Sequence, residues 1–329
     1  MELENLEVPT SVWESADFVM ANARHVAIKE SNLAVLADQV RLRFKQGFDT
    51  VEDAFGSTDD LERDINLVYF ETAANFCFWS QDPSDRWKFQ YGDALCGGWY
   101  GLRNVFASAL ANGVPVYDAT FMSRLTTAQA SELFRGVNDR QIPLLEWRVN
   151  NIVEAAEFLL RKHGGSAHHF IESCNFDAPT IAQEIVRALS SYRDGAWYRG
   201  RWIWILKRAQ ILPNDLSQLS QKYPEFTLKG KELLTIFADY KLPQVFRHYG
   251  VFEYSEVLAN KIDNRQLISN GSPEEVEIRA ATLVACKKLS KLCPDMTIAD
   301  IDVSLWLLSQ DARDDTEMKP HHMTVSYFY

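Results

Sequence analysis

Apolar residues recur at helical spacing along most of this chain, and this periodicity restricts its fold more than any other feature. In Ile142–His163 the pattern comes with Pro143 near the expected first turn and Gly164 after the expected end, which are the usual start and stop residues of a helix. The same spacing predicts further helices at 31–46, 64–78, 102–110, 126–134, 206–212, 233–240, 255–261, 273–289 and 298–309. Strands are predicted only at 88–91, as a pair within 197–205, and at 323–329. The sequence therefore predicts a mainly α fold with a few short strands.

Nothing in the sequence divides this helical pattern into separate domains, because it contains no internal repeat and no linker rich in Gly, Pro or Ser. With 329 residues the chain can bury a sizeable core as one large domain or as two small ones. We interpret residues 1–329 as a single unit of two lobes around a cleft, an N-terminal helical lobe (1–165) and a C-terminal lobe (166–329). We interpret the acidic cluster Asp311, Asp314, Asp315 and Glu317 as a solvated face.

The charge and the cysteines restrict the partners. A formal net charge of −11 repels polyanions, so we expect no direct binding of a long nucleic acid, whereas a mononucleotide needs only one local cationic pocket. The five cysteines form no CxxC pair and no Cys/His spacing typical of zinc, which indicates no metal site and reduced thiols in a cytoplasmic protein. The sequence shows no secretory signal and no apolar run of about 20 residues, so no membrane association is expected. It makes no prediction of the oligomeric state.

The stretch Phe237–Gln244 places a carboxylate in an apolar run. Burying a bare carboxylate is costly, so Asp239 must be solvated, paired or functional. Pro243 disfavours helical backbone at the residue before it, which places Asp239 near a helix break. With Phe237 before it and Tyr240 after it, the acid suits a pocket that stacks a ring and stabilises a developing cation. The alternative is a helix-capping Asp at a surface turn.

Two adjacent basic residues, Lys207 and Arg208, lie between apolar runs, so at least one of them is expected beside the core. One interpretation is a buried ion pair with an acid such as Asp239 or Glu277. The other is recognition of a single phosphate, which suits an Arg fork or a Lys point charge. Both interpretations hold if one of the two basic residues forms the ion pair and the other binds the phosphate.

Other candidates lie on predicted helices. Asn75, Phe78 and Trp79 share one apolar helix, in which Phe78 is interpreted as core. The Asn75 amide needs partners that a substrate or a neighbouring backbone could supply. Asp302 is interpreted either as the N-cap of a helix over 303–309 or as a carboxylate that binds a ligand. The adjacent pair His321-His322 is a poor metal chelate, because neighbouring side chains splay apart on a helix.

Six motifs occur in a recognisable order: Asn75-Phe76-Cys77-Phe78-Trp79-Ser80, Gly97-Gly98-Trp99-Tyr100, Leu206-Lys207-Arg208-Ala209-Gln210-Ile211-Leu212-Pro213, Phe237 to Gln244, Glu275-Val276-Glu277-Ile278-Arg279, and His321-His322 with Tyr329. Together they resemble the queuosine salvage protein family, the queuosine 5'-phosphate N-glycosidases. The resemblance extends from about Asn75 to the C-terminus, is strong between Ser191 and Arg279, and is weaker before Asp64. It rests on the order and spacing of the motifs together.

The resemblance implies hydrolysis of the N-glycosidic bond of queuosine 5'-phosphate or queuosine, which releases the 7-deazaguanine base queuine for salvage into tRNA. Asp239 would stabilise the oxocarbenium-like ribosyl cation and orient the attacking water, without a metal or other cofactor. In the family an acid near Asp302 lies with the base, often followed by an aromatic residue and, five residues on, by a second acid; this chain has Val303 and Leu307 there, and Val325 where some members carry Arg. The family is also similar in fold to helix-hairpin-helix DNA glycosylases.

Under this hypothesis Asp239 is the catalytic residue, and the substrate-binding residues are Phe237, Tyr240, Asp302, Lys207, Arg208, Asn75 and Trp79. The catalytic centre then lies in the C-terminal lobe. One alternative is a non-catalytic module that binds and sequesters a nucleotide, and another is a nucleosidase for a different modified nucleoside, which Val303 and Leu307 would suit. The presence of Asp239 together with Lys207 favours an enzyme.

Overall fold

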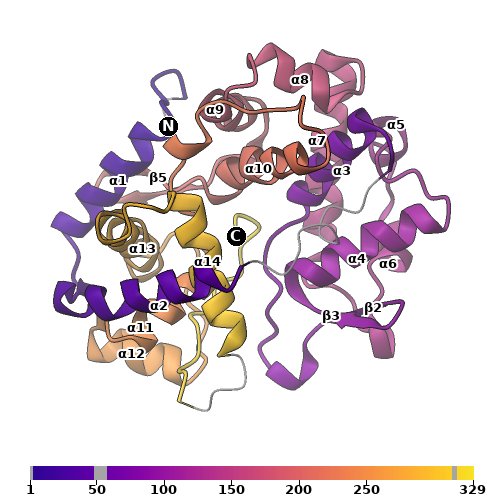
Figure 1. The fold of residues 1–329 in the computed structure, drawn as a ribbon. Helices are drawn as coiled ribbons and strands as arrows, with labels where there is room; N and C mark the ends of the chain where they lie inside the picture. The colour runs from indigo at the N-terminus through magenta and orange to yellow at the C-terminus, as the bar shows by residue number, and fades with distance from the viewer. Residues whose placement is uncertain (1–2, 48–57, 313–316) are drawn as a thin grey trace.

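Helices make up most of the fold, as the apolar spacing predicts. The computed structural model describes residues 3–47, 58–312 and 317–329, and fourteen α-helices lie within these ranges (Figure 1). Their bounds are α1 (Thr10–Ala21), α2 (Leu33–Lys45), α3 (Leu61–Ala73), α4 (Gly98–Ala111), α5 (Ala119–Met122), α6 (Thr127–Leu133), α7 (Leu145–His163), α8 (Ala167–Ser173), α9 (Ala178–Ala188), α10 (Lys207–Gln218), α11 (Lys241–His248), α12 (Glu256–Asp263), α13 (Pro273–Leu292) and α14 (Ile298–Asp311).

Six short strands in the described residues form three separate antiparallel pairs. The pairs are β1 (Val26–Ile28) with β6 (Phe252–Tyr254), β2 (Phe89–Tyr91) with β3 (Ala94–Cys96), and β4 (Gly195–Tyr198) with β5 (Arg201–Trp204). In the last pair Gly195 lies opposite Trp204. The strand predicted at 88–91 and the strand pair predicted within 197–205 are therefore confirmed.

The strand predicted at 323–329 is wrong, because this segment makes only an isolated bridge between Leu267 and Met323. Two of its other carbonyl groups accept hydrogen bonds from groups that are not part of a sheet. The backbone N–H of Cys77 donates to the Tyr329 carbonyl oxygen at 3.0 Å, and the Arg208 guanidinium donates to the Tyr327 carbonyl oxygen at 3.0 Å. The C-terminal segment is thus held by a loop and a side chain in place of a neighbouring strand.

Local sequence signals locate several helix ends correctly. Gly164 ends α7 in the left-handed conformation with φ 63°, as expected for a C-terminal glycine. The predicted capping box of Thr126 and Gln129 opens α6, with both of its hydrogen bonds formed. The predicted start of the long helix is wrong, since α7 begins at Leu145 and Pro143 lies before it. Leu144 takes a left-handed conformation with φ 56°, which interrupts the helical path at that point.

Two predicted helices are wrong in the parts that carry candidate residues. The helix predicted over 64–78 ends at Ala73, so Asn75, Phe78 and Trp79 lie in an irregular segment that follows α3. The helix predicted over 233–240 is not formed. A short 3-10 turn over Lys231–Leu233 is followed by irregular backbone up to Tyr240, and α11 starts at Lys241. In both places long-range contacts override the apolar spacing.

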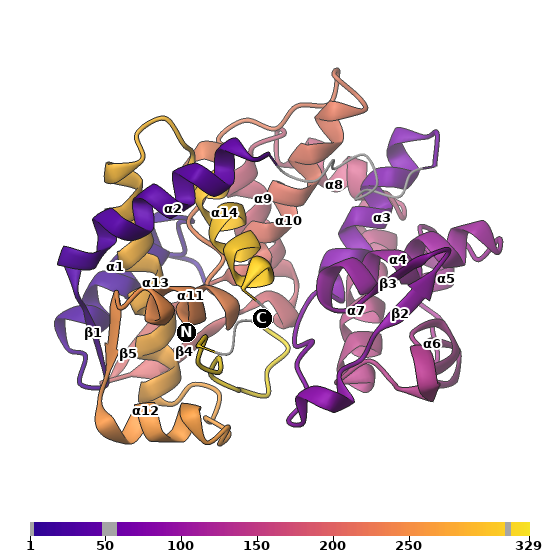
Figure 2. The ribbon, with the colours of Figure 1, turned by 60° about the horizontal axis from the view of Figure 1, so that its bottom comes forward.

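The two ends of the chain pack together. α1 lies against α13 and α2 against α14, and β1 pairs with β6, so residues 10–45 contact the C-terminal elements (Figures 1 and 2). Helices α3 to α7 group on the other side of the molecule in Figure 2. The division into lobes at residue 165 stays a prediction, and the packing places the first two helices beside the C-terminal elements.

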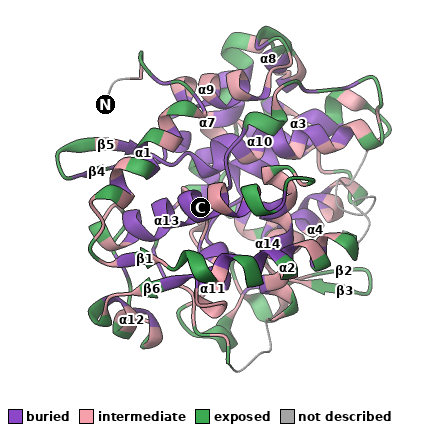
Figure 3. Ribbon diagram, turned by 60° about the vertical axis from the view of Figure 1, so that its left-hand side comes forward, coloured by how far each residue is buried: buried purple, intermediate pink, exposed green. Residues whose placement is uncertain are grey.

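Buried residues concentrate where α3, α10 and α13 face their neighbours, and exposed residues lie on the outer faces (Figure 3). Most buried apolar side chains belong to one continuous core. Within the described ranges no helix is both long and apolar enough to cross a membrane. Of the acidic cluster predicted to be solvated, Asp314 and Asp315 lie outside the described residues, whereas Asp311 forms an ion pair with Arg43.

Candidate active site

Asp239 lies at the end of the irregular segment that precedes α11. One of its carboxylate oxygens, Oδ1, accepts hydrogen bonds from the backbone N–H groups of Lys241 at 2.7 Å and Leu242 at 3.0 Å. The other oxygen, Oδ2, has no hydrogen-bond partner among the described residues. Asp239 therefore caps a helix, but it is half-buried and lies at no surface turn. One oxygen holds the residue in place, and the other is available to a ligand.

Burial raises the pKa of the Asp239 carboxyl, while the nearby positive charge of Lys207 and the two backbone N–H groups lower it. Desolvation disfavours the charged form of an acid, and a neighbouring cation favours it. The same opposition of effects is found at functional carboxylates and at structural ion pairs. At Asp239 these opposing pKa effects occur together with a carboxylate oxygen, Oδ2, that has no partner in the described structure. This combination favours the functional interpretation.

Lys207 is the first residue of α10, and only 6% of its surface is exposed. Its backbone N–H donates to Asp194 at 2.9 Å, but its ammonium group forms no hydrogen bond or ion pair with a described residue. Burial lowers the pKa of Lys207, and the negative charges of Asp239, Asp215 and Asp302 raise it. The buried ammonium thus lies among carboxyl groups that influence its pKa but do not bond to it directly. Its N–H donors are available for an anionic ligand.

Arg208 lies beside Lys207 in the sequence but points to a different part of the structure. Its guanidinium donates to the carbonyl oxygens of Ala73 at 3.1 Å, Tyr327 at 3.0 Å and Ser191 at 3.2 Å. Its carbon also lies 4.5 Å from the centre of the Tyr192 ring. These contacts join α3 and α10 to the C-terminal segment. Arg208 is therefore engaged in packing, and the predicted phosphate-binding role falls more naturally to Lys207.

Asp302 lies inside α14, and its interpretation as an N-cap is wrong. The helix starts at Ile298 and is capped by Thr297, which forms a capping box with Asp300. The Asp302 carboxylate instead accepts a hydrogen bond from the backbone N–H of Phe237 at 2.8 Å. Burial raises the pKa of Asp302 well above its usual value, and the negative charge of Asp239 raises it further. The two acids are therefore close enough to influence each other.

Aromatic rings lie next to these acids. Phe237 and Tyr240 are buried, yet neither belongs to the main hydrophobic core. The ring of Tyr240 lies 4.7 Å from that of His321, which in turn lies 6.5 Å from the ring of Trp79. The indole N–H of Trp79 is buried without a hydrogen-bond partner in the described structure. The structure thus brings Trp79 and Tyr240 together through His321, at one side of Asp239.

The segment after α3 is held by a buried arginine from α7. The Arg148 guanidinium donates to the carbonyl oxygens of Ala74, Phe76 and Cys77, and Cys77 takes a left-handed conformation with φ 42°. Burial lowers the pKa of Arg148 to about 9. These contacts replace the helical hydrogen bonds that the sequence predicts here. Asn75 is buried in this segment, and its side-chain amide forms no hydrogen bond with a described residue.

Sequence reasoning missed a group of ionisable residues beside Lys207. Burial raises the pKa of Asp215 to about 6 and that of Glu71 to about 7. Glu71 accepts a hydrogen bond from Arg103 at 2.7 Å, and both of these side chains are buried. Asp215 lies on α10 two turns after Lys207. This helical spacing was the signal from which the sequence could have placed Asp215 on the same helix face as Lys207. His321 was considered as a metal ligand and as part of a C-terminal motif, and its ring contacts place it between Tyr240 and Trp79.

The site has no arrangement that would hold a metal ion, since no cluster of three His, Cys, Asp or Glu side chains with suitable positions exists in the described parts of the chain. Glu277, the other acid considered as a partner, is engaged elsewhere. It accepts hydrogen bonds from the backbone N–H groups of Arg24 and His25 and from the Tyr198 hydroxyl at 2.8 Å. Glu277 therefore joins α13 to the turn before β1.

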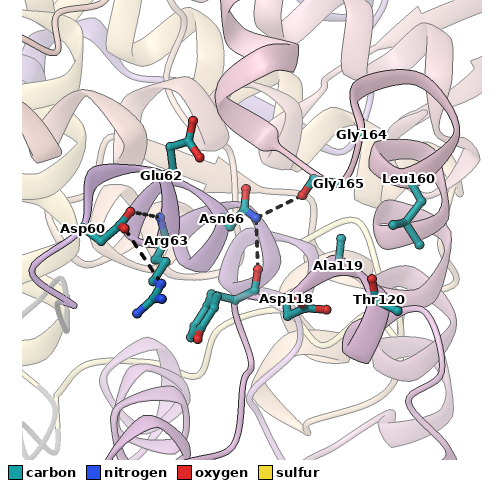
Figure 4. Close-up of a pocket in the computed structure, with 11 residues that line it drawn as sticks. Asp60, Glu62, Arg63, Asn66, Asp118, Ala119, Thr120, Leu160, Gly164 and Gly165 are labelled. Atoms are coloured by element: carbon teal, nitrogen blue, oxygen red, sulfur yellow. Dashed lines mark hydrogen bonds and ion pairs between the residues drawn. The ribbon is translucent and has the colours of Figure 1, made fainter.

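A separate polar pocket of about 250 Å³ lies between α3, α5 and the end of α7 (Figure 4). At its centre the Asn66 amide donates to the carbonyl oxygens of Tyr117 at 3.0 Å and Gly165 at 3.1 Å. The Asn66 oxygen accepts from the backbone N–H of Ala167 at 2.7 Å. Asn66 thus ties three segments together, and none of the predicted site residues lines this pocket.

The candidate site therefore combines carboxyl groups with raised pKa values, a buried ammonium group and aromatic rings outside the core, which is typical of an enzyme that binds a ring-bearing anion. Comparison with known proteins narrows this class. The sequence profile described as "queuosine salvage protein" matches residues 56–329. The chain belongs to this family.

Curated relatives carry the name queuosine 5'-phosphate N-glycosylase/hydrolase. A relative from Sphaerobacter thermophilus is 33% identical over 276 residues, which cover 83% of each chain. One from Bos taurus is 29% identical, with 96% of this chain and 98% of the relative covered. One from Schizosaccharomyces pombe is 24% identical, with 91% of both chains covered.

Proposed function

We propose that this protein hydrolyses the N-glycosidic bond of queuosine 5'-phosphate and releases queuine and ribose 5-phosphate. Membership of the queuosine salvage family and the names of the curated relatives support this reaction. The observation that carries the assignment to a site is the Asp239 carboxylate. It is held by two backbone N–H groups through one oxygen and is available through the other.

Asp239 is well suited to a reaction that passes through a positively charged sugar. When the bond between C1' and the base nitrogen breaks, positive charge develops on the ribosyl ring, and a nearby carboxylate stabilises it. The free oxygen of Asp239 also orients a water molecule for attack on C1'. One water proton goes to the departing base and the hydroxyl group to the sugar. Because the two backbone N–H groups already hold the other oxygen, little reorganisation is needed during the reaction.

The other residues of the site divide the recognition of substrate between them. The Lys207 ammonium binds the 5'-phosphate and, through its charge, keeps Asp239 ionised. Asp302 accepts hydrogen bonds from the N–H edge of the deazaguanine base, and Phe237, Tyr240 and Trp79 pack against its rings. The Asn75 amide supplies a further hydrogen bond to the substrate. Leu307, which is 6% exposed, is the apolar residue at the position where the family resemblance implies a second acid.

The proposal is tested by replacing Asp239 with Asn, which keeps the shape of the side chain and its cap on α11 but removes the charge. Purified wild-type and Asp239→Asn proteins are incubated with queuosine 5'-phosphate and with queuosine, and free queuine is followed by mass spectrometry. We expect turnover to fall by at least about 10²–10³-fold, with an unchanged unfolding temperature. Near-normal turnover by a folded Asp239→Asn protein would remove Asp239 from the mechanism.

The location and the fold relationship are part of the same proposal. Five free cysteines, all in the described residues, support a cytoplasmic location. We also expect the helices around Asp239 to share the arrangement of helix-hairpin-helix DNA glycosylases, in a two-lobed unit that binds a nucleotide and no nucleic acid. A structure with bound queuosine 5'-phosphate would test the expected helix arrangement and the expected two-lobed unit.

A further inference from the structure

Arg279 joins two elements of the candidate site that are far apart in the sequence. It lies on α13, and 2% of its surface is exposed. Its Nε donates to the main-chain carbonyl oxygen of Ala238 at 3.0 Å. Ala238 directly precedes Asp239, so this hydrogen bond holds the backbone at the point from which the Asp239 side chain extends.

The other end of the same guanidinium reaches the start of α10. Its two terminal nitrogens donate to the two carboxylate oxygens of Asp194, each at 2.7 Å. One of these oxygens also accepts the backbone N–H of Lys207 at 2.9 Å. This N–H belongs to the first turn of the helix, where the helix itself offers no acceptor. Asp194 therefore acts as a cap from another segment and determines where Lys207 begins α10.

A continuous path of hydrogen bonds thus runs from the carbonyl group before Asp239, through Arg279 and Asp194, to the backbone of Lys207. Arg279 is also enclosed by Glu275, 3.4 Å from Nη1, and by the ring of Tyr329, 3.9 Å from the guanidinium carbon. Its donors are directed to protein groups. Arg279 is accordingly placed to position other residues and does not contact the reacting atoms.

A stabilising role alone is a weak explanation for this ion pair. Burying two charges costs about as much as their attraction returns, so a buried pair contributes little net stability compared with apolar side chains. A planar guanidinium with two parallel bonds to one carboxylate does, however, fix direction and distance. This geometric property matches what the site needs, because the Asp239 carboxyl and the Lys207 ammonium interact across the space between their elements.

We propose that the Arg279–Asp194 pair sets the separation between the Asp239 carboxylate and the Lys207 ammonium and thereby controls the rate of bond cleavage. This inference rests on the proposed function. A displacement of a catalytic group by about 1 Å can cost about 100-fold in rate. Substitutions in the pair should therefore affect kcat much more than KM.

The test uses Arg279→Lys, which keeps the charge but cannot form the two parallel bonds, and Asp194→Asn, which keeps the size of the side chain. The matched control is Arg247→Lys. Arg247 forms the same type of double hydrogen bond with Asp263, at 2.6 and 3.1 Å, between α11 and α12. Each protein is assayed for kcat and KM with queuosine 5'-phosphate, and the folded fraction is measured on the same preparation.

We expect Arg279→Lys and Asp194→Asn to lower kcat by about 10- to 100-fold, with KM changed less than kcat, and Arg247→Lys to keep its kcat. If kcat per folded molecule is the same in Arg279→Lys or Asp194→Asn as in Arg247→Lys, the pair is only structural and the inference is wrong. Asp194→Asn decides the matter if Arg279→Lys does not fold, since it retains an oxygen that can accept the Lys207 N–H.

Failure of the proposed function is distinguishable from failure of this inference. If the wild-type protein releases no queuine, the function is wrong. The positioning role is then decided by NMR titration of the Asp239 carboxyl group, identified by its absence in Asp239→Asn. A pKa that shifts in Arg279→Lys shows that the separation from Lys207 has changed, and an unshifted pKa overturns the inference.

Discussion

At the scale of single residues, the candidate site depends on a few ionisable groups that burial makes sensitive to one another. Asp239 and Asp302 both have raised pKa values, and each is influenced by the charge of Lys207. A carboxylate that must be ionised to stabilise a cation, yet is half-buried, benefits from a nearby cation that is not bonded directly to it. Lys207 provides this charge, and its ammonium donors stay available for the phosphate that we propose it binds.

The first prediction concerns Lys207→Met. The active form of Asp239 is the carboxylate, so the rate should fall as the pH decreases through the raised pKa of this group. Removal of the positive charge raises that pKa further, and the acidic limb of the pH profile of kcat/KM should move to higher pH. Queuosine is the preferred substrate for this measurement. It carries no phosphate, so the loss of Lys207 does not also remove a phosphate contact. Lys287→Met, which removes an exposed lysine, is the control, and identical acidic limbs in Lys207→Met and wild type would contradict the prediction.

The second prediction concerns Asp302→Asn. The asparagine oxygen can still accept the Phe237 N–H, so the amide NH₂ group then faces the ligand where the base offers N–H donors. Leaving a buried donor without its acceptor costs about 1–3 kcal/mol. We therefore expect the affinity for free queuine to fall by about tenfold or more, while thermal unfolding stays close to that of the wild type. Equal queuine affinity in the folded variant would place base recognition elsewhere.

At the scale of secondary-structure elements, α14 separates a capping function from the binding function proposed for Asp302. Thr297 and Asp300 cap the helix at an exposed position, and Asp302 lies inside it with its carboxylate directed to the Phe237 N–H. The start of the helix and the anchor of the segment 234–239 therefore depend on different side chains. This arrangement allows the two contributions to be measured independently.

The third prediction follows from this separation. Thr297→Ala should lower the free energy of unfolding by about 0.5–2 kcal/mol, the usual effect of losing an N-cap hydroxyl, and should leave kcat and queuine affinity unchanged. Thr126→Ala removes the equivalent cap from α6 and is the matched comparison for stability, measured by denaturant unfolding. A loss of kcat in Thr297→Ala alone would show that the start of α14 is coupled to the site.

At the scale of the whole molecule, buried ionisable groups give the stability a pH dependence with opposing contributions. The raised pKa values of Glu71, about 7, and Asp215, about 6, mean that the folded protein takes up these protons before the unfolded chain does. Their contributions increase stability as the pH falls. Burial and the charge of Arg279 lower the pKa of His322 to about 3, and the pKa of His321 is also lowered by burial. The histidines therefore act in the opposite direction.

The fourth prediction isolates His322. Below about pH 6.5 the unfolded chain binds a proton at this residue that the folded protein does not bind. Its contribution to the free energy of unfolding should therefore decrease by about 1.4 kcal/mol for each pH unit between about pH 6.5 and 3. His322→Gln removes this slope, so the variant should gain about 2 kcal/mol relative to wild type between pH 6.5 and pH 5. The free energy of unfolding of both proteins is measured by urea unfolding at the two pH values. An equal change with pH in His322→Gln and in wild type would contradict the assignment.

Features that depend on nearby residues can be predicted from the sequence alone. The helical spacing identifies most of the helices, Gly164 marks the end of α7, and Thr126 with Gln129 marks the start of α6. These signals work because a helix end is decided within one turn by backbone conformation and by side-chain caps. The motif order also identified the family, and with it the candidate acid Asp239, since such motifs persist in the linear sequence.

The assembly of the site, in contrast, depends on contacts between residues that are far apart in the sequence. The Phe237 N–H bonds to Asp302, 65 residues away, and Arg279 bonds to Asp194, 85 residues away. Arg148 draws the carbonyl groups of 74–77 out of the predicted helix from more than 70 residues away in sequence. In each case a buried polar group must find a partner, and that partner lies wherever the packed helices bring one within reach. Sequence spacing records no such distances. Pro243 indicated a helix break near Asp239, but the contacts that hold the irregular backbone there became visible only in the folded chain.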